Sequence, residues 1–289
     1  MKDKMTWEET IQFIRTKPEY STLVKDAYFD ADLNLNVERF YNSEEFKATL
    51  QIIKTYTKQA KTILDIGSGN GIASVSFAKL GYEVTSIEPD TSSTIGANAI
   101  EQLKIKNNLN NLKIYSSYAE DLDLPENYFD IVYVRQAMHH ANNLDQFIKE
   151  CVRVLKPNGL LLTIRDHVIY DEEDKQRFLE AHPLHKYYGG ENAFTASEYK
   201  QAITKAGATV IKELKFFDSK INYAPLTTDD IEEIKKEQTS YLKNRLKSKL
   251  GFLTNIPLII ELVKKIKGIN TLEEKNFPGR MYSYIARKQ

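Results

Sequence analysis

The chain of 289 residues carries 40 basic and 40 acidic side chains, so its formal net charge is zero, and 42% of its residues are hydrophobic. This composition is typical of one or two globular domains with a substantial core. The neutral balance argues against a broad phosphate-binding surface, and we expect no nucleic-acid partner. The single cysteine, Cys151, excludes an internal disulfide framework and indicates a buried core thiol.

The N-terminal part of the chain predicts helices. Thr6 and Glu9 have the spacing of a capping box, and Glu44–Tyr56 shows apolar residues at helical intervals after Ser43, which can cap that helix. The aromatic and acidic stretch 26–43 has no clean period and predicts a loop or a broken helix. No run is apolar enough for a signal peptide or a membrane span, so we expect a cytoplasmic protein.

Residues 62–90 combine a short apolar strand, a glycine turn, a helix and a second apolar strand. The turn reads Gly67-Ser68-Gly69-Asn70-Gly71, and Glu88 ends the second strand. Glycines let the backbone turn tightly and approach a ligand, and the helix N-terminus offers unpaired N–H groups. A carboxylate at this point can accept hydrogen bonds from a ribose diol. A dinucleotide fingerprint would place its third glycine at Ile72, so an adenosine-type ligand other than NAD is favoured.

The pattern Asp-x-Gly-x-Gly-x-Gly from Asp65 resembles motif I of the class I S-adenosylmethionine (SAM) dependent methyltransferases, and the resemblance extends from Thr62 to about Ala208. It implies SAM as the cofactor, with the acid of the motif near the methionine end. Tyr118 stands where the family usually has an aspartate that contacts adenine. The implied cofactor-binding residues are Asp65, Gly67, Ser68, Gly69, Gly71, Glu88, Pro89, Tyr118, Ala119, Glu120 and Arg135.

Strands that alternate with helices predict a parallel sheet covered on both faces. The resemblance implies an α/β, doubly wound, seven-stranded, mostly parallel sheet with an antiparallel last strand. The later elements are expected as helices at 92–106, 144–155 and 196–206 and strands at 112–115, 129–134, 160–164, 209–217 and 280–287. We expect a helical cap segment at 1–60, the SAM-binding domain at 61–220 and 278–289, and a helical insertion at 221–277 that forms a lid.

Candidate catalytic side chains follow the fourth and fifth strands. His139 and His140 come after the fourth, and Asp166 comes after the fifth. An imidazole can take a proton from a hydroxyl as its oxygen attacks the methyl group, and a carboxylate can orient that imidazole. Such a pair resembles that of sugar O-methyltransferases. We favour His139 as the inward-facing histidine, although the sequence leaves the choice open.

The segment after the fifth strand is rich in hydrogen-bonding and aromatic groups. It predicts a polar substrate pocket with contacts from His167, His185, Tyr188 and Glu191. These histidines and carboxylates could also bind a metal. No tight ligand spacing such as His-Glu-x-x-His supports that alternative, and we predict no metal.

The sequence thus predicts methyl transfer from SAM to a hydroxyl of a small polar acceptor, such as a sugar or a secondary metabolite. The alternatives are an RNA or protein methyltransferase and a non-catalytic SAM- or nucleotide-binding module. The basic segment 235–267 favours packing on the core, with peripheral membrane contact as the alternative. The sequence does not decide between O-, N- and C-methylation, nor does it give the oligomeric state.

Overall fold

The computed structural model describes residues 4–57, 59–234 and 274–289, together with the single positions 236, 240, 244 and 247. Its contacts divide the chain into Met1–Asn222 with Pro278–Gln289, and Tyr223–Phe277. Apart from those single positions, the predicted membrane contact at 235–267 lies outside the described residues, as does most of the predicted lid at 221–277. None of the described helices is long and apolar enough to cross a membrane.

The N-terminal segment is helical. Glu9 donates its N–H to Thr6 Oγ1 at 3.2 Å while Thr6 donates its N–H to Glu9 Oε2 at 2.8 Å, which confirms the predicted capping box. Ser43 Oγ accepts the N–H of Phe46 at 3.0 Å and caps the helix before the first strand. The elements are α1 (Trp7–Arg15), η1 (Pro18–Tyr20), α2 (Ser21–Asp26), α3 (Leu33–Asn42) and α4 (Glu44–Tyr56).

The strands of the described chain form one sheet in the order β3-β2-β1-β4-β5-β8-β7, with the short β6 paired to β5. The pairings are parallel except those of β8, which runs antiparallel to β5 and to β7. The predicted mostly parallel sheet with an antiparallel last strand is therefore confirmed. The strands are β1 (Thr62–Ile66), β2 (Glu83–Ile87), β3 (Leu112–Tyr115), β4 (Phe129–Arg135), β5 (Leu155–Ile169), β6 (Phe194–Thr195), β7 (Ala208–Leu214) and β8 (Met281–Lys288).

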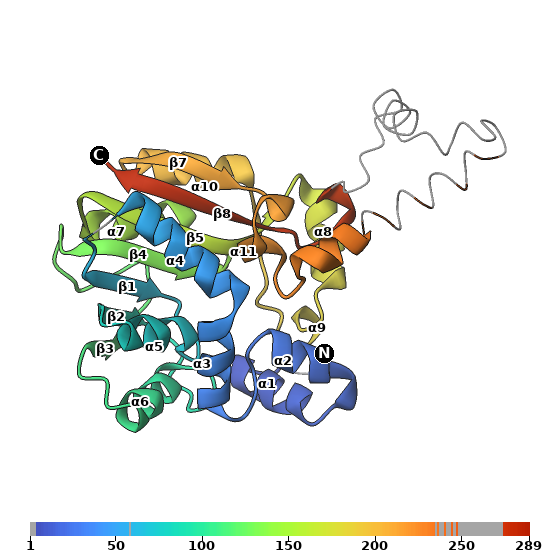
Figure 1. Cartoon of the computed structure of the whole chain (residues 1–289), viewed down its shortest axis with the longest axis horizontal. Helices are drawn as coiled ribbons and strands as arrows, with labels where there is room; N and C mark the ends of the chain where they lie inside the picture. Colours follow the sequence, from blue (N-terminus) through green and yellow to red (C-terminus); the bar gives the residue numbers. More distant parts are fainter. Residues whose placement is uncertain are drawn as a thin grey trace. The chain divides into compact units, whose positions relative to one another are not determined.

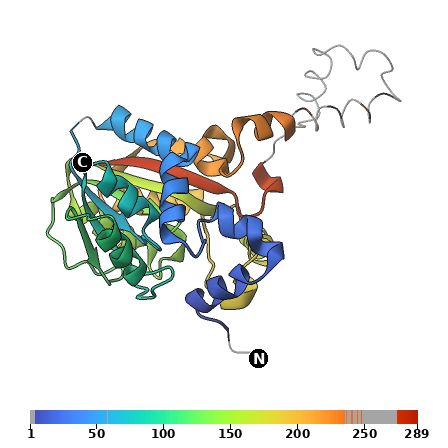
Figure 2. The same cartoon turned by 60° about the horizontal axis from the view of Figure 1, so that its bottom comes forward.

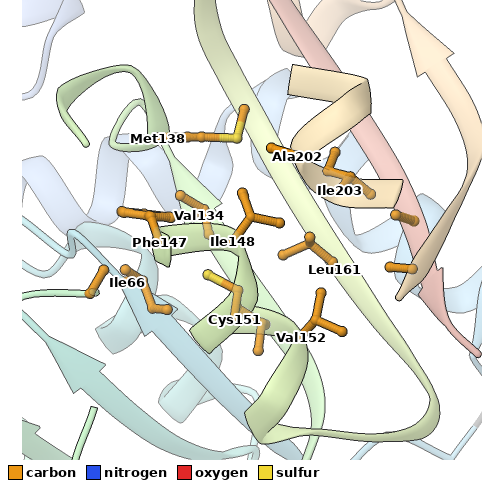
Figure 3. Packing of buried hydrophobic residues seen from close by; sticks show 14 of the residues in the cluster. Ile66, Val134, Met138, Phe147, Ile148, Cys151, Val152, Leu161, Ala202 and Ile203 are labelled. Atoms are coloured by element: carbon orange, nitrogen blue, oxygen red, sulfur yellow. The ribbon is translucent and has the colours of Figure 1, made fainter. Parts of the chain in front are cut away.

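Helices cover both faces of the sheet (Figures 1 and 2). On one face, buried side chains of α3, α4, α5 (Ile72–Lys79) and α6 (Ala97–Lys106) pack against the strands. On the other face, those of α7 (Leu144–Val154) and α10 (Ala196–Lys205) do so. Cys151 of α7 lies beside Phe147, Ile148 and Val152 between that helix and the sheet, where it is fully buried (Figure 3). Burial raises the pKa of its thiol, which fits the predicted role as a core residue.

The other helices lie between the strands and after β7. The helices between the strands are α5 (Ile72–Lys79), α6 (Ala97–Lys106), η2 (Met138–His140), α7 (Leu144–Val154), α8 (Glu172–Ala181), α9 (His185–Tyr188) and α10 (Ala196–Lys205). After β7 come η3 (Phe216–Asp218), α11 (Lys220–Tyr223) and η5 (Glu274–Asn276). Thr195 and Glu198 form the second predicted capping box, at the start of α10.

Two helical expectations need correction. Residues 33–42, expected as loop or broken helix, form the regular helix α3, because Asp32 Oδ1 accepts the N–H of Asn34 at 2.9 Å and Val37 and Phe40 are buried. The helix expected from residue 92 begins only at Ala97. The preceding turn folds back on Asp90, and a Cβ at Gly96 would lie 2.3 Å from the carbonyl oxygen of that residue.

The fifth strand is longer than expected. The apolar run predicts residues 160–164, whereas β5 extends to Ile169 and pairs with β4, β6 and β8. Arg165, Asp166 and His167 lie within this extension and are buried. Polar residues inside a strand hide it from a hydrophobic pattern, and here they are the residues of the candidate site.

Candidate active site

The glycine turn lies beside the carboxylate that ends β2. Because β1 and β2 are parallel neighbours, both carboxyl ends lie at the same edge of the sheet. The N–H of Gly69 donates to Glu88 Oε2 at 2.6 Å. Gly67 has φ of +66°, and a Cβ there would come within 2.3 Å of the Cβ of Ala137 in the loop after β4. A side chain at this position would separate the two loops, so the turn requires glycine.

Asp65 and Glu88 are buried carboxyl groups with raised pKa values. Burial raises the pKa of Asp65 to about 6, although Ser74 donates its hydroxyl to Asp65 Oδ2 at 2.5 Å and so favours the charged form. Ser68 Oγ donates to the carbonyl oxygen of Asp65 at 2.9 Å and fixes the turn. Burial likewise raises the pKa of Glu88 to about 7. The N–H of Asp90 donates to Glu88 Oε1 at 2.9 Å and favours the charged form, but burial outweighs it. Both groups therefore titrate close to neutral pH.

The segment expected to contact adenine lies next to the loop after β4. Tyr118 is 64% exposed and Ala119 is buried. Glu120 Oε1 accepts the N–H groups of Asn142 and Asn143 at 2.9 and 3.4 Å. This carboxylate thus holds the segment against the start of α7.

Arg135, expected near the cofactor, lies in a buried ion pair. Its Nε and Nη2 donate to the two carboxylate oxygens of Glu45 at 2.5 and 3.0 Å. Its guanidinium lies 5.7 and 5.3 Å from the ring centres of Tyr28 and Phe40. Arg165 Nε lies 3.8 Å from the same carboxylate. Burial opposes the charge on Arg135, but Glu45 outweighs it and raises the pKa. The sequence did not suggest this network, since its partners lie far apart along the chain.

The structure places His139, rather than His140, on Asp166. His139 is 2% exposed; its backbone N–H donates to Asp166 Oδ1 at 3.1 Å, and its Nδ1 lies 3.0 Å from the same oxygen. Asp166 follows the part of β5 that pairs with β4, so the neighbouring strands bring the two residues together. His140 is exposed, and its Nδ1 lies 3.1 Å from the carbonyl oxygen of Gly190.

Glu191 closes the other side of His139. Its Oε2 lies 3.6 Å from His139 Nε2, its Oε1 lies 3.5 Å from His182 Nε2, and Tyr188 donates its hydroxyl to Oε1. Burial alone would lower the pKa of His139, but the neighbouring carboxylates of Asp166 and Glu191 raise it to about 9. Burial also opposes the charge on Glu191, but His139 lowers its pKa overall. At neutral pH the two side chains therefore carry opposite charges.

Of the other residues expected to bind substrate, one lies beside His139 and two lie farther from it. His167 lies with His139, at 4.9 Å between ring centres, and its Nδ1 is 2.8 Å from the carbonyl oxygen of Gly279. The N–H of His185 donates to His182 Nδ1 at 3.2 Å, so His185 meets the cluster through that residue. Tyr188 also packs on Trp7 of α1, at 4.6 Å between ring centres. His182 was missed by the sequence analysis, although its place in a polar, aromatic segment was a usable signal.

Comparison with known proteins identifies the central domain. Residues 64–163 match the family described as "Methyltransferase domain". The part of the chain that resembles a methyltransferase domain is therefore residues 64–163. The chain is 32% identical over 124 residues to an uncharacterised methyltransferase YcgJ of Bacillus subtilis, covering 43% of this chain and 47% of that protein. It is 30% identical over 100 residues to a ubiquinone biosynthesis O-methyltransferase of Bradyrhizobium sp., covering 35% of this chain and 38% of that protein.

The methyltransferase domain also has structural relatives. A geranyl diphosphate C-methyltransferase of Streptomyces coelicolor was solved with Mg²⁺, geranyl-S-thiolodiphosphate and S-adenosylhomocysteine (SAH). It superposes with a TM-score of 0.55 at 13% identity, covering 84% of this chain and 76% of that one. At this identity the likeness shows the fold alone. The chain spans less than half the length of the curated relatives named above. The predicted class of domain and its fold are confirmed.

Proposed function

We propose that the protein is a SAM-dependent methyltransferase that transfers a methyl group to a hydroxyl of a small polar acceptor, such as a sugar or a secondary metabolite. The domain match and the SAH present in the Streptomyces structure support SAM as the cofactor. One observation carries the proposal. Glu88 follows β2, His139 follows β4 and Asp166 lies in the later part of β5, in a sheet where β2, β1, β4 and β5 are successive parallel neighbours.

On the cofactor side, Glu88 is the proposed partner of the two ribose hydroxyls. The N–H of Gly69 and the N–H of Asp90 hold its two oxygens in place. Asp65 is the proposed acid near the methionine end, held by Ser74. A carboxylate that is fixed in advance loses little conformational entropy on binding, which supports these roles.

On the acceptor side, His139 is the proposed catalytic base and Asp166 the residue that orients it. The acceptor oxygen attacks the SAM methyl carbon, the carbon–sulfur bond breaks to leave SAH, and the hydroxyl proton goes to His139 Nε2. Nδ1 faces Asp166 at 3.0 Å, so Nε2 is the atom that can turn to an acceptor. With a pKa of about 9, this imidazole is protonated at neutral pH while Glu191 faces it, so Nε2 must first be released from Glu191.

A hydroxyl acceptor is favoured over a carbon acceptor by the His139–Asp166 pair. The names of the relatives include both O- and C-methyltransferases, so they do not choose between the two. An imidazole oriented by a carboxylate suits proton removal from a hydroxyl. The neutral net charge disfavours the alternative of an RNA acceptor.

Two measurements test this function. Isothermal titration calorimetry with SAH tests the cofactor, and we expect one site per chain; no detectable binding would overturn the proposal. Incubation with radiolabelled SAM and separate pools of small metabolites, RNA and protein tests the acceptor class. We expect label in the small-metabolite pool, whereas label confined to RNA or protein would reject the proposed acceptor.

A further inference from the structure

Three side chains converge beside the proposed acceptor position in an arrangement that suits a metal ion. One ligand atom from each of His139, His167 and Glu191 lies within 4.8 Å of the others. The side chains of His139 and Glu191 are 2% and 5% exposed, and His167 is buried. Bringing two imidazoles and a carboxylate together in a buried position is costly unless something binds them.

Both histidines are held through Nδ1, so Nε2 is the atom of each ring that can bind a metal ion, which in His139 displaces the proton on Nε2. His167 Nδ1 lies 2.8 Å from the carbonyl oxygen of Gly279, which can only accept, so Nδ1 carries the proton. His139 Nδ1 lies 3.0 Å from Asp166 Oδ1, which also accepts the backbone N–H of His139. Histidines that bind metals are oriented in this way, with one ring nitrogen on a carboxylate or a carbonyl and the other on the ion.

Glu191 offers an oxygen that lacks a hydrogen-bond partner. Its Oε1 accepts the hydroxyl of Tyr188, whereas its buried Oε2 makes no hydrogen bond to any described residue. A buried carboxylate oxygen without a donor costs free energy of the order of 1–3 kcal/mol or more. Oε2 lies 3.6 Å from His139 Nε2. Two ligand atoms at about 2.05 Å from a tetrahedral zinc ion are about 3.4 Å apart, so these two atoms already have nearly that spacing.

Two neighbouring histidines differ from this pair, His182 in which ring nitrogen carries the proton and His140 in its exposure to solvent. His182 Nδ1 accepts the N–H groups of Leu184 and His185 at 3.4 and 3.2 Å. Its proton therefore lies on Nε2, which faces Glu191 Oε1 at 3.5 Å as a donor. His140 is exposed and faces the carbonyl oxygen of Gly190. His182 and His140 therefore do not belong to the buried group formed by His139, His167 and Glu191.

We propose that His139, His167 and Glu191 bind one divalent first-row transition-metal ion, of which Zn²⁺ is the probe, through the two Nε2 atoms and Oε2. Two imidazoles with a single carboxylate favour such an ion over Mg²⁺, which prefers a shell of oxygen ligands. Three protein ligands leave a coordination position open, as in catalytic zinc sites. The sequence predicts no metal, because the three ligands come from separate segments with no local spacing.

The ion also bears on the acceptor, in a step that rests on the proposed function. Bound at the open position, an acceptor hydroxyl loses its proton more easily, because the ion stabilises the charged oxygen. In the metal-bound form His139 is a ligand and the hydroxyl proton goes to solvent water, whereas in the metal-free form His139 Nε2 takes that proton. Metal binding is measured without SAM or acceptor, so it can succeed or fail independently of methyl transfer.

Calorimetric titration of chelator-treated protein with Zn²⁺ tests the site, with bound metal counted by mass spectrometry after dialysis. We expect one ion per chain, with Kd below about 10 µM, and no competition from millimolar Mg²⁺. The His167→Asn and Glu191→Gln variants should each weaken binding more than the 10- to 100-fold that is typical for loss of an outer-shell group. The His140→Asn variant is the matched control, because it removes a neighbouring imidazole that is not a proposed ligand. Its Kd for Zn²⁺ should stay within about threefold of that of the unaltered protein, less than the loss expected for an outer-shell group.

Absence of stoichiometric Zn²⁺ in the unaltered protein would overturn the proposal. An equal loss of affinity in His140→Asn would also overturn it, because the histidine cluster would then bind ions without the stated ligands. SAH affinity, measured on each variant, reports whether the fold is intact. A variant that keeps SAH affinity and loses Zn²⁺ supports the site. Zn²⁺ binding in a protein that never binds SAH would keep the site and refute the proposed methyltransferase function.

Discussion

Glu88 gives the sharpest test of the cofactor site, because its pKa of about 7 lies within the range where binding is easily measured. If the ionised carboxylate accepts the ribose hydroxyls, the apparent Kd for SAH is the intrinsic Kd multiplied by one plus the ratio of protonated to ionised Glu88. That factor is about 11 at pH 6 and about 1.1 at pH 8, so affinity should rise about tenfold between them. Calorimetry with SAH across this range measures the change.

The Glu88→Gln variant separates this effect from other titrating groups. It replaces two charge-assisted hydrogen bonds, together worth about 3 kcal/mol, so SAH affinity at pH 8 should fall about 100-fold. Asp65, with a pKa of about 6, can leave at most about a twofold pH dependence over the same range. A variant that keeps the full tenfold dependence would refute the assignment of Glu88 to the ribose.

The same pKa has an opposite consequence for stability. Because burial raises the pKa of Glu88 from 4.5 to about 7, its contribution to stability is complete below pH 4.5 and is lost as the pH rises through 7. The shift corresponds to about 3 kcal/mol. The unliganded Glu88→Gln variant should therefore unfold at no lower temperature than the unaltered protein at pH 8. A large drop in Tm would mean that its weak SAH binding reflects a damaged fold.

The site and its supports allow three further tests. His139→Ala should lower kcat by about 100-fold or more with the Kd for SAH unchanged, and an unchanged rate would reject its catalytic role. Gly67→Ala should lower the free energy of unfolding by more than about 1 kcal/mol, because φ is +66° and the new Cβ would meet Ala137 at 2.3 Å; thermal melts measure the change. Glu45→Gln leaves Arg135 buried without its charge partner and should cost about 3–5 kcal/mol in urea denaturation, and a loss below about 1 kcal/mol would contradict this.

Much of the fold follows from local signals in the sequence. The strand predicted at 112–115 coincides with β3, and the predicted glycine turn leads from β1 into α5. These elements have apolar runs and turn residues that agree with each other. The helix α3 was missed because Asn36 is buried in its inner face, where its Nδ2 donates to the carbonyl oxygen of Asp30 at 2.8 Å. A polar residue in that position breaks the apolar period.

The candidate site was predictable in its parts but not in its assembly. The resemblance gave His139 and Asp166, since the order of the strands brings their loops together. The approach of Glu191 to His139 depends on how the segment after β5 folds back, which no local pattern records. The pairing of Glu45 with Arg135 is likewise a contact between distant segments.

The place of β8 between β5 and β7 has a consequence for synthesis on the ribosome. Among the described strands, β7 has β8 as its sheet neighbour, and β8 is made last. While residues 281–288 remain in the exit tunnel, the nascent chain holds β7 without a neighbour and β5 with an open edge. An unpaired strand edge is a template for aggregation. Vectorial synthesis therefore leaves β7 and one edge of β5 unpaired, and in need of protection from aggregation, until β8 emerges from the tunnel.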